Sequence, residues 1–213
     1  METNYVILIS LLILWCSIHS LMIDNKFIEI VENMFKSHFR YYRLFYNIFA
    51  IISLMPIILY SYSLPSLIYF QWDGYFIIPQ VFLLIIALIL LIAGSINYNF
   101  LQFLGIQQII ENKSNKSLSK DGILKREGIL NITRHPWYTA FIIILWVREL
   151  NSTTLIINII FSVYVVVGTF LEEKKLKVEF REAYTNYQKD VSMLFPIKWI
   201  KLKFKKTKVS LDL

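Results

Sequence analysis

The sequence predicts an all-α, polytopic membrane protein with about five hydrophobic helices. Hydrophobic residues make up 56% of its 213 residues and the mean hydropathy is +0.54, more than an ordinary globular core requires. The apolar residues also gather into long blocks that are nearly free of charge, at residues 6–21, 45–62, 75–96 and 155–171. Each block is close to the roughly 20 residues that span a hydrocarbon core, so each is expected to be a membrane helix.

A fifth apolar block, at residues 137–147, is too short to cross a core of about 30 Å at about 1.5 Å per residue. We therefore expect residues 137–171 to form a C-terminal helix-turn-helix hairpin that enters the membrane and returns to the side it left. The first block follows Glu2 and no basic residue, and no Ala-x-Ala-like site follows it, which favours a retained helix over a cleaved signal. The lone Cys16 in this block is typical of a small apolar residue in a membrane helix.

Basic residues predict the orientation, because short loops rich in Lys and Arg stay cytoplasmic. Basic residues are frequent between the first two blocks and again between residues 107 and 134. The loop at 63–74 has no basic residue, and Asp73 is its only charged one. The N-terminus is therefore expected outside, and the C-terminal segment in the cytoplasm, with a bacterial inner membrane as the expected location. That segment, after residue 171, carries eleven of the 22 basic residues.

The end of the chain pairs this positive charge with apolar side chains. Residues 198–206 alternate Lys with Trp, Ile, Leu and Phe, a pattern that suits an anionic lipid surface. Membrane lipid is therefore an expected partner. Despite the net charge of +7, the sequence contains no nucleic-acid-binding module, and we expect neither a nucleic-acid partner nor an obligate protein partner.

We expect a single membrane domain, 1–213, with unequal parts. Residues 1–99 are predicted to be a three-helix scaffold, residues 100–196 a catalytic half with most of the polar residues, and residues 197–213 a basic tail. The low-complexity stretch at 112–121, rich in Asn, Ser and Lys, predicts a solvated loop between the first two parts.

The most informative motif is Arg-His-Pro-Trp-Tyr at residues 134–138, with Glu172-Glu173 where the predicted hairpin ends. Each part alone has a simple structural explanation. Residues 134–138 could be a helix flank with an interfacial aromatic belt, and Glu172-Glu173 could be a solvated helix end. Their joint occurrence in this order favours function, because charged residues at membrane depth are costly unless paired. Two opposite charged groups at one membrane face can hold the two ends of a zwitterionic cofactor.

These residues and their neighbours resemble the isoprenylcysteine carboxyl methyltransferase superfamily, which also contains phospholipid and methanethiol S-methyltransferases. The resemblance rests on Gly128-x5-Arg134-His135-Pro136-x-Tyr138, Glu172-Glu173-x2-Leu176, Phe180-x3-Tyr184-x2-Tyr187 and Pro196. Trp15-x3-His19-Ser20 and the segment at 40–47 are similar to the thiol-methylating and related bacterial branches. Many relatives have Gly-Pro-Tyr where this chain has Gly-Ile-Leu at 128–130, which places it away from the prenylcysteine branch.

The resemblance implies S-adenosylmethionine as the cofactor, bound without a Rossmann domain. The sequence is compatible, because its six glycines form no Gly-x-Gly. The cofactor-binding residues are then expected to be Gln107, Gly128, Ile129, Leu130, His135, Pro136, Tyr138, Glu172 and Glu173. Adjacent helix positions differ by about 100° in direction, so only one of the two glutamates is expected to meet the cofactor ammonium, and the sequence does not distinguish them.

Methyl transfer from a sulfonium depends mainly on positioning, because the methyl group is already activated. Arg134 and His135 are the expected catalytic residues, suited to the cofactor carboxylate. For a small or lipophilic thiol or carboxylate acceptor, the favoured classes, the nucleophile is the anion that Arg134 would stabilise. An amine acceptor would need a base instead.

Two other functions remain compatible with the sequence. Sterol reductases share a similar C-terminal architecture, but we find no basic cluster placed for the additional phosphate of NADPH. A non-enzymatic assembly factor or carrier would use the polar hairpin for packing or passage. No metal site is expected, because neither His19 nor His38 has Cys, Asp or Glu at metal-site spacing; His19 is the more informative, as an ionisable residue in a span.

Overall fold

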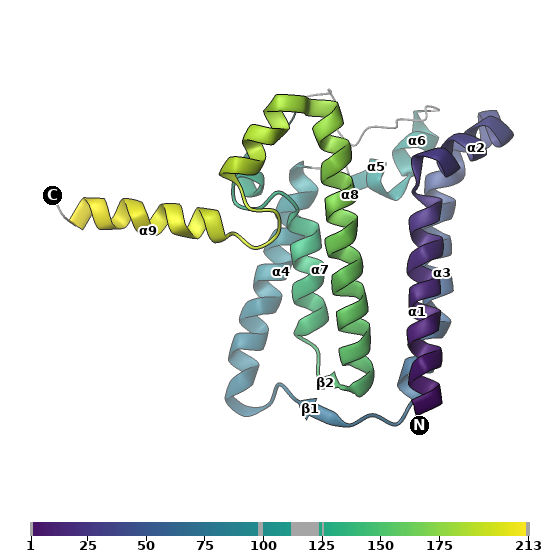
Figure 1. The fold of residues 1–213 in the computed structure, drawn as a ribbon, viewed down its shortest axis with the longest axis horizontal. Coiled ribbons are helices and arrows are strands. Elements are labelled where there is room, and N and C mark those ends of the chain that lie inside the picture. The colour runs from purple at the N-terminus through teal and green to yellow at the C-terminus, as the bar shows by residue number, and fades with distance from the viewer. Residues whose placement is uncertain (1, 98–99, 112–123, 125, 212–213) are drawn as a thin grey trace. The chain divides into compact units, whose positions relative to one another are not determined.

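The computed structural model describes residues 2–97, 100–111, 124 and 126–211, and these are almost entirely helical (Figure 1). Four segments of the described chain are long and apolar enough to cross a membrane: Glu2–Met22, Asn25–Ser63, Gly74–Ile96 and Ser152–Asp190. Each contains one predicted block, which confirms a nearly all-α, integral membrane protein. The fifth block forms a shorter helix, and the total number of crossings, the hairpin and the cytoplasmic tail stay predictions.

The helices and strands follow the chain in a simple order, where η marks a 3-10 helix. They are α1 (Glu2–Met22), α2 (Asn25–Phe35), η1 (Lys36–Tyr41), α3 (Tyr42–Ser63), β1 (Ile68–Phe70), η2 (Gly74–Phe76), α4 (Ile77–Asn97), α5 (Phe100–Leu104), α6 (Ile106–Ile110), η3 (Gly128–Asn131), α7 (Pro136–Trp146), β2 (Leu150–Asn151), α8 (Ser152–Asp190) and α9 (Ile197–Leu211). The predicted loop at 112–121 lies outside the described residues.

The chain divides into two compact units, each discontinuous in sequence. Unit 1 comprises Met1–Gln71, Asn99–Leu118 and Glu149–Tyr164, and unit 2 comprises Trp72–Tyr98, Ser119–Arg148 and Val165–Leu213. The predicted division into scaffold, catalytic half and tail follows the chain order and stays a prediction.

Unit 1 is built on α1 and α3, which pack against each other. Leu8 and Leu12 of α1 are fully buried, whereas about half of the other apolar side chains of this helix are exposed, as lipid contact allows. Gly105 brings α5 and α6 against α3, because a Cβ there would lie 2.5 Å from the backbone nitrogen of Leu44. Its φ of 88° also favours glycine.

A short antiparallel pair of strands, β1 and β2, closes unit 1 before α8 begins, with Ile68 opposite Asn151. The side chain of Asn151 accepts a hydrogen bond from the backbone N–H of Thr154 (2.9 Å), which caps the start of α8. Hydrogen bonds donated by Gln71 and Asn151 lower the pKa of the Glu149 carboxyl group. The polar residues at this turn are therefore used in local structure.

Unit 2 is built on α4 and α7, which lie side by side (Figure 1). Ala87 and Leu90 of α4 pack with Ala140 of α7 in a buried apolar cluster. Near the end of α4, Gly94 allows Trp137 to approach so closely that the indole Nε1 donates to the carbonyl of Leu91 (3.1 Å). These small residues let the two helices meet closely, as is common in membrane helix packing.

The helix α8 is bent at Arg181, whose φ of 47° and ψ of −121° are not helical. Figure 1 shows the yellow-green end of α8 turning sharply away from the direction of its first part. After the bend, Tyr184 and Tyr187 pack with Leu176 and Phe180 in one cluster. Tyr184 and Tyr187 of the C-terminal motif are thus core residues, and the half-buried Leu176 and Phe180 pack against them from the other side of the bend.

We predict that Gly94→Ala destabilises the protein by about 1–3 kcal/mol, because the added methyl group would lie 2.5 Å from the rigid Trp137 indole. Gly168→Ala is the matched control, because nothing lies within 4 Å of its Cβ position. It should not destabilise the protein, since alanine favours a helix by about 1 kcal/mol over glycine. Unfolding of the detergent-solubilised variants in dodecyl sulfate measures both changes. Equal stabilities would contradict the close packing of α4 on α7.

Candidate functional site

The centre of the candidate site is a buried ion pair between Arg134 and Glu173. Nε and Nη2 of Arg134 each lie 2.6 Å from Oε1 of Glu173, and the two side chains are only 7% and 8% exposed. Nη1 of Arg134 also donates to the backbone carbonyls of Gln188 and Val191. One guanidinium thus joins the segment before α7, the middle of α8 and the chain that follows the bend. Such pairing is what permits a charge to be buried.

His135 lies between the two glutamates at the start of α7. Its Nε2 is 3.2 Å from Oε1 of Glu173, and its Nδ1 is 3.8 Å from Oε2 of Glu172. The imidazole stacks on the ring of Tyr138, with centroids 5.5 Å apart. Its non-helical backbone is expected before Pro136, which takes the first helical position of α7.

The two glutamates differ in their surroundings. Both oxygens of Glu173 accept hydrogen bonds from protein groups, Oε1 from Arg134 and Oε2 from the side-chain amide of Gln188 (2.6 Å). Glu172 is more open, with a side chain that is 29% exposed. Gln188 was not identified from the sequence. It directly follows Tyr187 of the quoted motif, but only the bend at Arg181 brings it back to Glu173.

The segment before α7 is held in place by the segment after α8. Thr133 forms a parallel bridge with Ser192, the N–H of Arg134 donates to the Ser192 carbonyl (3.0 Å), and the N–H of His135 donates to the Met193 carbonyl (3.1 Å). The backbone under both predicted catalytic residues is therefore paired. The rigid backbone supports the orientation of the two side chains.

The other predicted cofactor residues lie in different surroundings. Gly128, with a φ of 54°, begins η3, where Ile129 packs on the apolar cluster of α4 and α7. The carbonyl of Leu130 accepts a hydrogen bond from the hydroxyl of Tyr187 (2.5 Å), in unit 2. Gln107 belongs to unit 1, where its side-chain amide donates to Glu111. Their roles toward a cofactor stay predictions.

Tyr184 adds a polar group that the sequence analysis had assigned no chemical role. It is 1% exposed, and its hydroxyl lies beside Glu173 without a well-aligned hydrogen bond to any residue that the structure describes. Glu173 and Arg134 are its main charged neighbours. The hydroxyl therefore belongs to the immediate surroundings of the buried ion pair.

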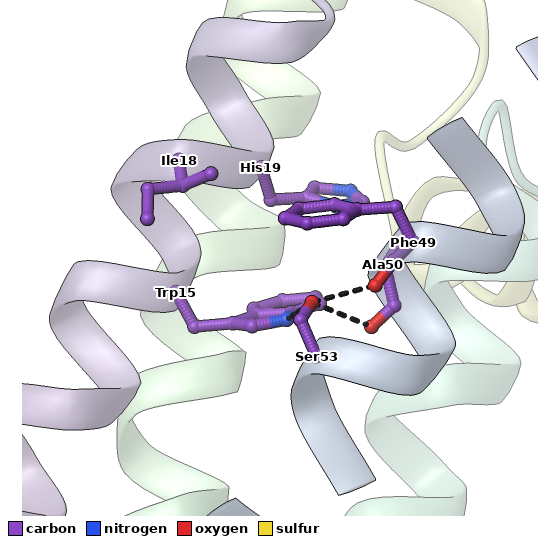
Figure 2. A pocket seen from close by; sticks show the side chains of 6 residues that line it. All are labelled: Trp15, Ile18, His19, Phe49, Ala50 and Ser53. Atoms are coloured by element: carbon purple, nitrogen blue, oxygen red, sulfur yellow. Dashed lines mark hydrogen bonds between the residues drawn. The ribbon is translucent and has the colours of Figure 1, made fainter. Parts of the chain in front are cut away.

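A second polar cluster lies in unit 1 around His19. The hydroxyl of Tyr46 lies 2.5 Å from Nε2 of His19, and the indole of Trp15 stacks on the imidazole with centroids 4.7 Å apart. Figure 2 shows Trp15, His19 and Phe49 around a small cavity, where Trp15 donates to Ser53 (3.0 Å). The cavity volume is about 40 Å³, far below the roughly 300–1,000 Å³ of drug-sized sites. No group of three His, Cys, Asp or Glu suited to a metal occurs in the described part of the chain.

Comparison with known proteins agrees with the methyltransferase resemblance. The family described as NnrU protein matches residues 7–199. The methanethiol S-methyltransferase of Pseudomonas deceptionensis is 39% identical over 77 residues, 36% of this chain and 29% of that protein. Methanethiol S-methyltransferase 1 of Bradyrhizobium diazoefficiens is 26% identical over 152 residues, 71% of this chain and 53% of that protein. The chain thus spans about a third to a half of these relatives' length. No solved structure matches it.

We predict that Glu173→Gln destabilises the protein by about 3 kcal/mol or more, because it leaves the Arg134 charge buried without a counter-charge. The double variant Arg134→Met/Glu173→Met should regain part of that loss. Asp190→Asn is the control, since its partner Arg126 forms an exposed pair worth about 1 kcal/mol or less. Dodecyl sulfate unfolding gives all three values, and a loss for Glu173→Gln no larger than for Asp190→Asn would count against a buried pair.

Two tyrosine variants separate a structural hydroxyl from a poorly aligned one. Tyr187→Phe removes the hydrogen bond to Leu130 and should cost about 1 kcal/mol of stability. Tyr184→Phe removes a buried hydroxyl whose neighbour Glu173 is poorly aligned for a hydrogen bond, and should cost less stability than Tyr187→Phe. Thermal unfolding of the ligand-free protein compares them. A larger loss for Tyr184→Phe than for Tyr187→Phe would show that the Tyr184 hydroxyl is already satisfied.

Proposed function

This chain belongs to the NnrU protein family, and we propose that it is a membrane-embedded methyltransferase that uses S-adenosylmethionine. The relatives named methanethiol S-methyltransferase support the reaction class. On this chain, the observation that carries the proposal is the position of His135 between a paired carboxylate, Glu173, and a more open one, Glu172. Such a site offers one negative group to a ligand while the other maintains the structure.

We assign the cofactor ammonium to Glu172. Glu173 has both oxygens engaged by Arg134 and Gln188, so binding there would require a buried ion pair to break. The carboxylate of Glu172 is within 3.8 Å of His135 and partly exposed, and a charge-assisted contact to an ammonium group needs no such rearrangement.

The aromatic groups of the site suit the rest of the cofactor. When bound, S-adenosylmethionine supplies a methyl group on a positively charged sulfonium. The stacked rings of His135 and Tyr138 offer an aromatic surface, which attracts cations through the ring electrons. The buried hydroxyl of Tyr184, beside Glu173, adds a further polar group to the site. In this assignment Arg134 is a positioning residue, which holds Glu173 and through it the imidazole of His135.

The acceptor class favoured here is a small or lipophilic thiol, with a carboxylate second and an amine third. The names of the matched relatives specify methanethiol, a thiol of the smallest size. A thiol reacts as its anion, which forms when its proton leaves to water or to a base. The transfer itself then needs little beyond orientation and exclusion of water, which a paired, buried site provides. We further propose that the chain acts as one domain in a bacterial inner membrane, with its N-terminus outside and its C-terminus in the cytoplasm.

We predict that the detergent-purified protein binds S-adenosylmethionine in calorimetry and that Glu172→Gln weakens this binding about tenfold or more, by removing a charge-assisted contact. Glu179→Gln, an exposed carboxylate on the same helix, is the matched control and should bind like the wild type. Formation of dimethyl sulfide from methanethiol tests the acceptor.

Binding of NADPH in place of S-adenosylmethionine would replace the proposal with a membrane reductase. Binding of neither cofactor would leave a non-enzymatic assembly or carrier protein. Equal loss of affinity in Glu172→Gln and Glu179→Gln would contradict the assignment of Glu172 while keeping the methyltransferase.

A further inference from the structure

We propose that α9 lies in the plane of the membrane and binds anionic lipid headgroups. The helix follows α8 after a short connection, and the described side chains of its first nine residues alternate between two kinds. The apolar ones are Ile197, Trp199, Ile200, Leu202 and Phe204, and the basic ones are Lys198, Lys201, Lys203 and Lys205.

The apolar residues of α9 include an exposed stripe. Ile197, Ile200 and Phe204 are 57%, 41% and 73% exposed. At about 100° per residue, their directions fall within about 60° of one another, so they share one face of the helix. Leu202, which is 55% exposed, lies on the opposite side. Lys201 and Lys203 lie on the two sides of this stripe. Long lysine stems can lie along an apolar surface while their ammonium groups reach polar headgroups.

The direction of α9 agrees with a position at the membrane surface. Within unit 2, Figure 1 shows α9 running crosswise to α4 and α7. Because Gly74–Ile96, which includes α4 up to Ile96, is a candidate span, a helix crosswise to it runs along the membrane plane. An amphipathic helix in that plane buries its apolar face at the boundary between headgroups and acyl chains.

Lys198 fixes this direction relative to the end of α8. Its Nζ donates to the carbonyls of Gln188 (2.6 Å) and Lys189 (2.9 Å), and its backbone N–H donates to Oγ of Ser192 (3.0 Å). A cation is favoured at the C-terminal end of a helix, where carbonyls lack helical partners. The start of α9 is thus tied to the end of α8, and Lys201, Lys203 and Lys205 are exposed.

Anionic lipid fits these features better than a soluble partner. An acidic protein or a nucleic acid would attract the lysines but would not explain an apolar stripe that runs crosswise to a candidate span. Trp199, with Lys203 over its ring at 5.5 Å, is the aromatic type enriched at membrane interfaces. Near an anionic leaflet, each basic residue strengthens binding by about fivefold.

The test places one spin label on the apolar stripe of α9 and another about 100° around the helix from it, in the full-length protein. Cys16 is the only cysteine, so Cys16→Ala gives a background for Phe204→Cys or Lys205→Cys. The proteins are placed in nanodiscs of phosphatidylcholine with or without phosphatidylglycerol. With the anionic lipid, we expect the label at 204 to be accessible to oxygen and shielded from a water-soluble nickel chelate. The label at 205 should stay accessible to the chelate.

Charge variants supply the controls in the Phe204→Cys background. Lys201→Gln/Lys203→Gln should lower the ratio of docked to undocked helix about twenty-five-fold, whereas Lys201→Arg/Lys203→Arg should retain it. High salt should act like the glutamine pair. A label at 204 that stays open to the chelate in anionic discs would overturn the proposal. So would equal shielding in both lipids, or shielding at 204 and 205 together, which would indicate a protein interface.

Discussion

The ion pair between Arg134 and Glu173 is the interaction on which the rest of unit 2 depends. Because both groups are buried, removal of either one would leave a buried charge without a counter-charge and would strongly destabilise the fold. Arg134 also uses the carbonyls of Gln188 and Val191, so the same guanidinium requires the chain after the bend to return to the start of α7. The positions of His135 and Glu172 follow from this arrangement, since each is adjacent in sequence to a member of the pair.

The bend at Arg181 makes that return possible, at a local cost. A positive φ with a strongly negative ψ is unfavourable for a residue that carries a side chain, and tertiary contacts must compensate. Tyr184, Tyr187 and Val191 supply them by forming a buried cluster after the bend. The hydroxyl of Tyr187 extends this support to η3 through Leu130. Packing at the C-terminal motif thus maintains the geometry of the polar residues.

The polar side chains of the described chain form separate groups with different environments. The group in unit 2 is ionic, buried and bonded to backbone carbonyls. The group in unit 1, around His19 and Tyr46, is aromatic and borders a small cavity. Either environment costs less at membrane depth than an isolated ionisable side chain would.

The sequence by itself determined the helical class and the four long apolar segments. The thickness of a bilayer prescribes the length of an apolar helix, and a helix satisfies its backbone hydrogen bonds internally, where lipid offers none. It also identified the residue types of the candidate site, since Arg134, His135 and the two glutamates stand out beside apolar segments. Only the tertiary structure decided which glutamate pairs with Arg134 and that Gln188 joins them. These outcomes depend on the direction of each side chain around α8 and on a bend at Arg181, a residue type that no local rule marks as a turn.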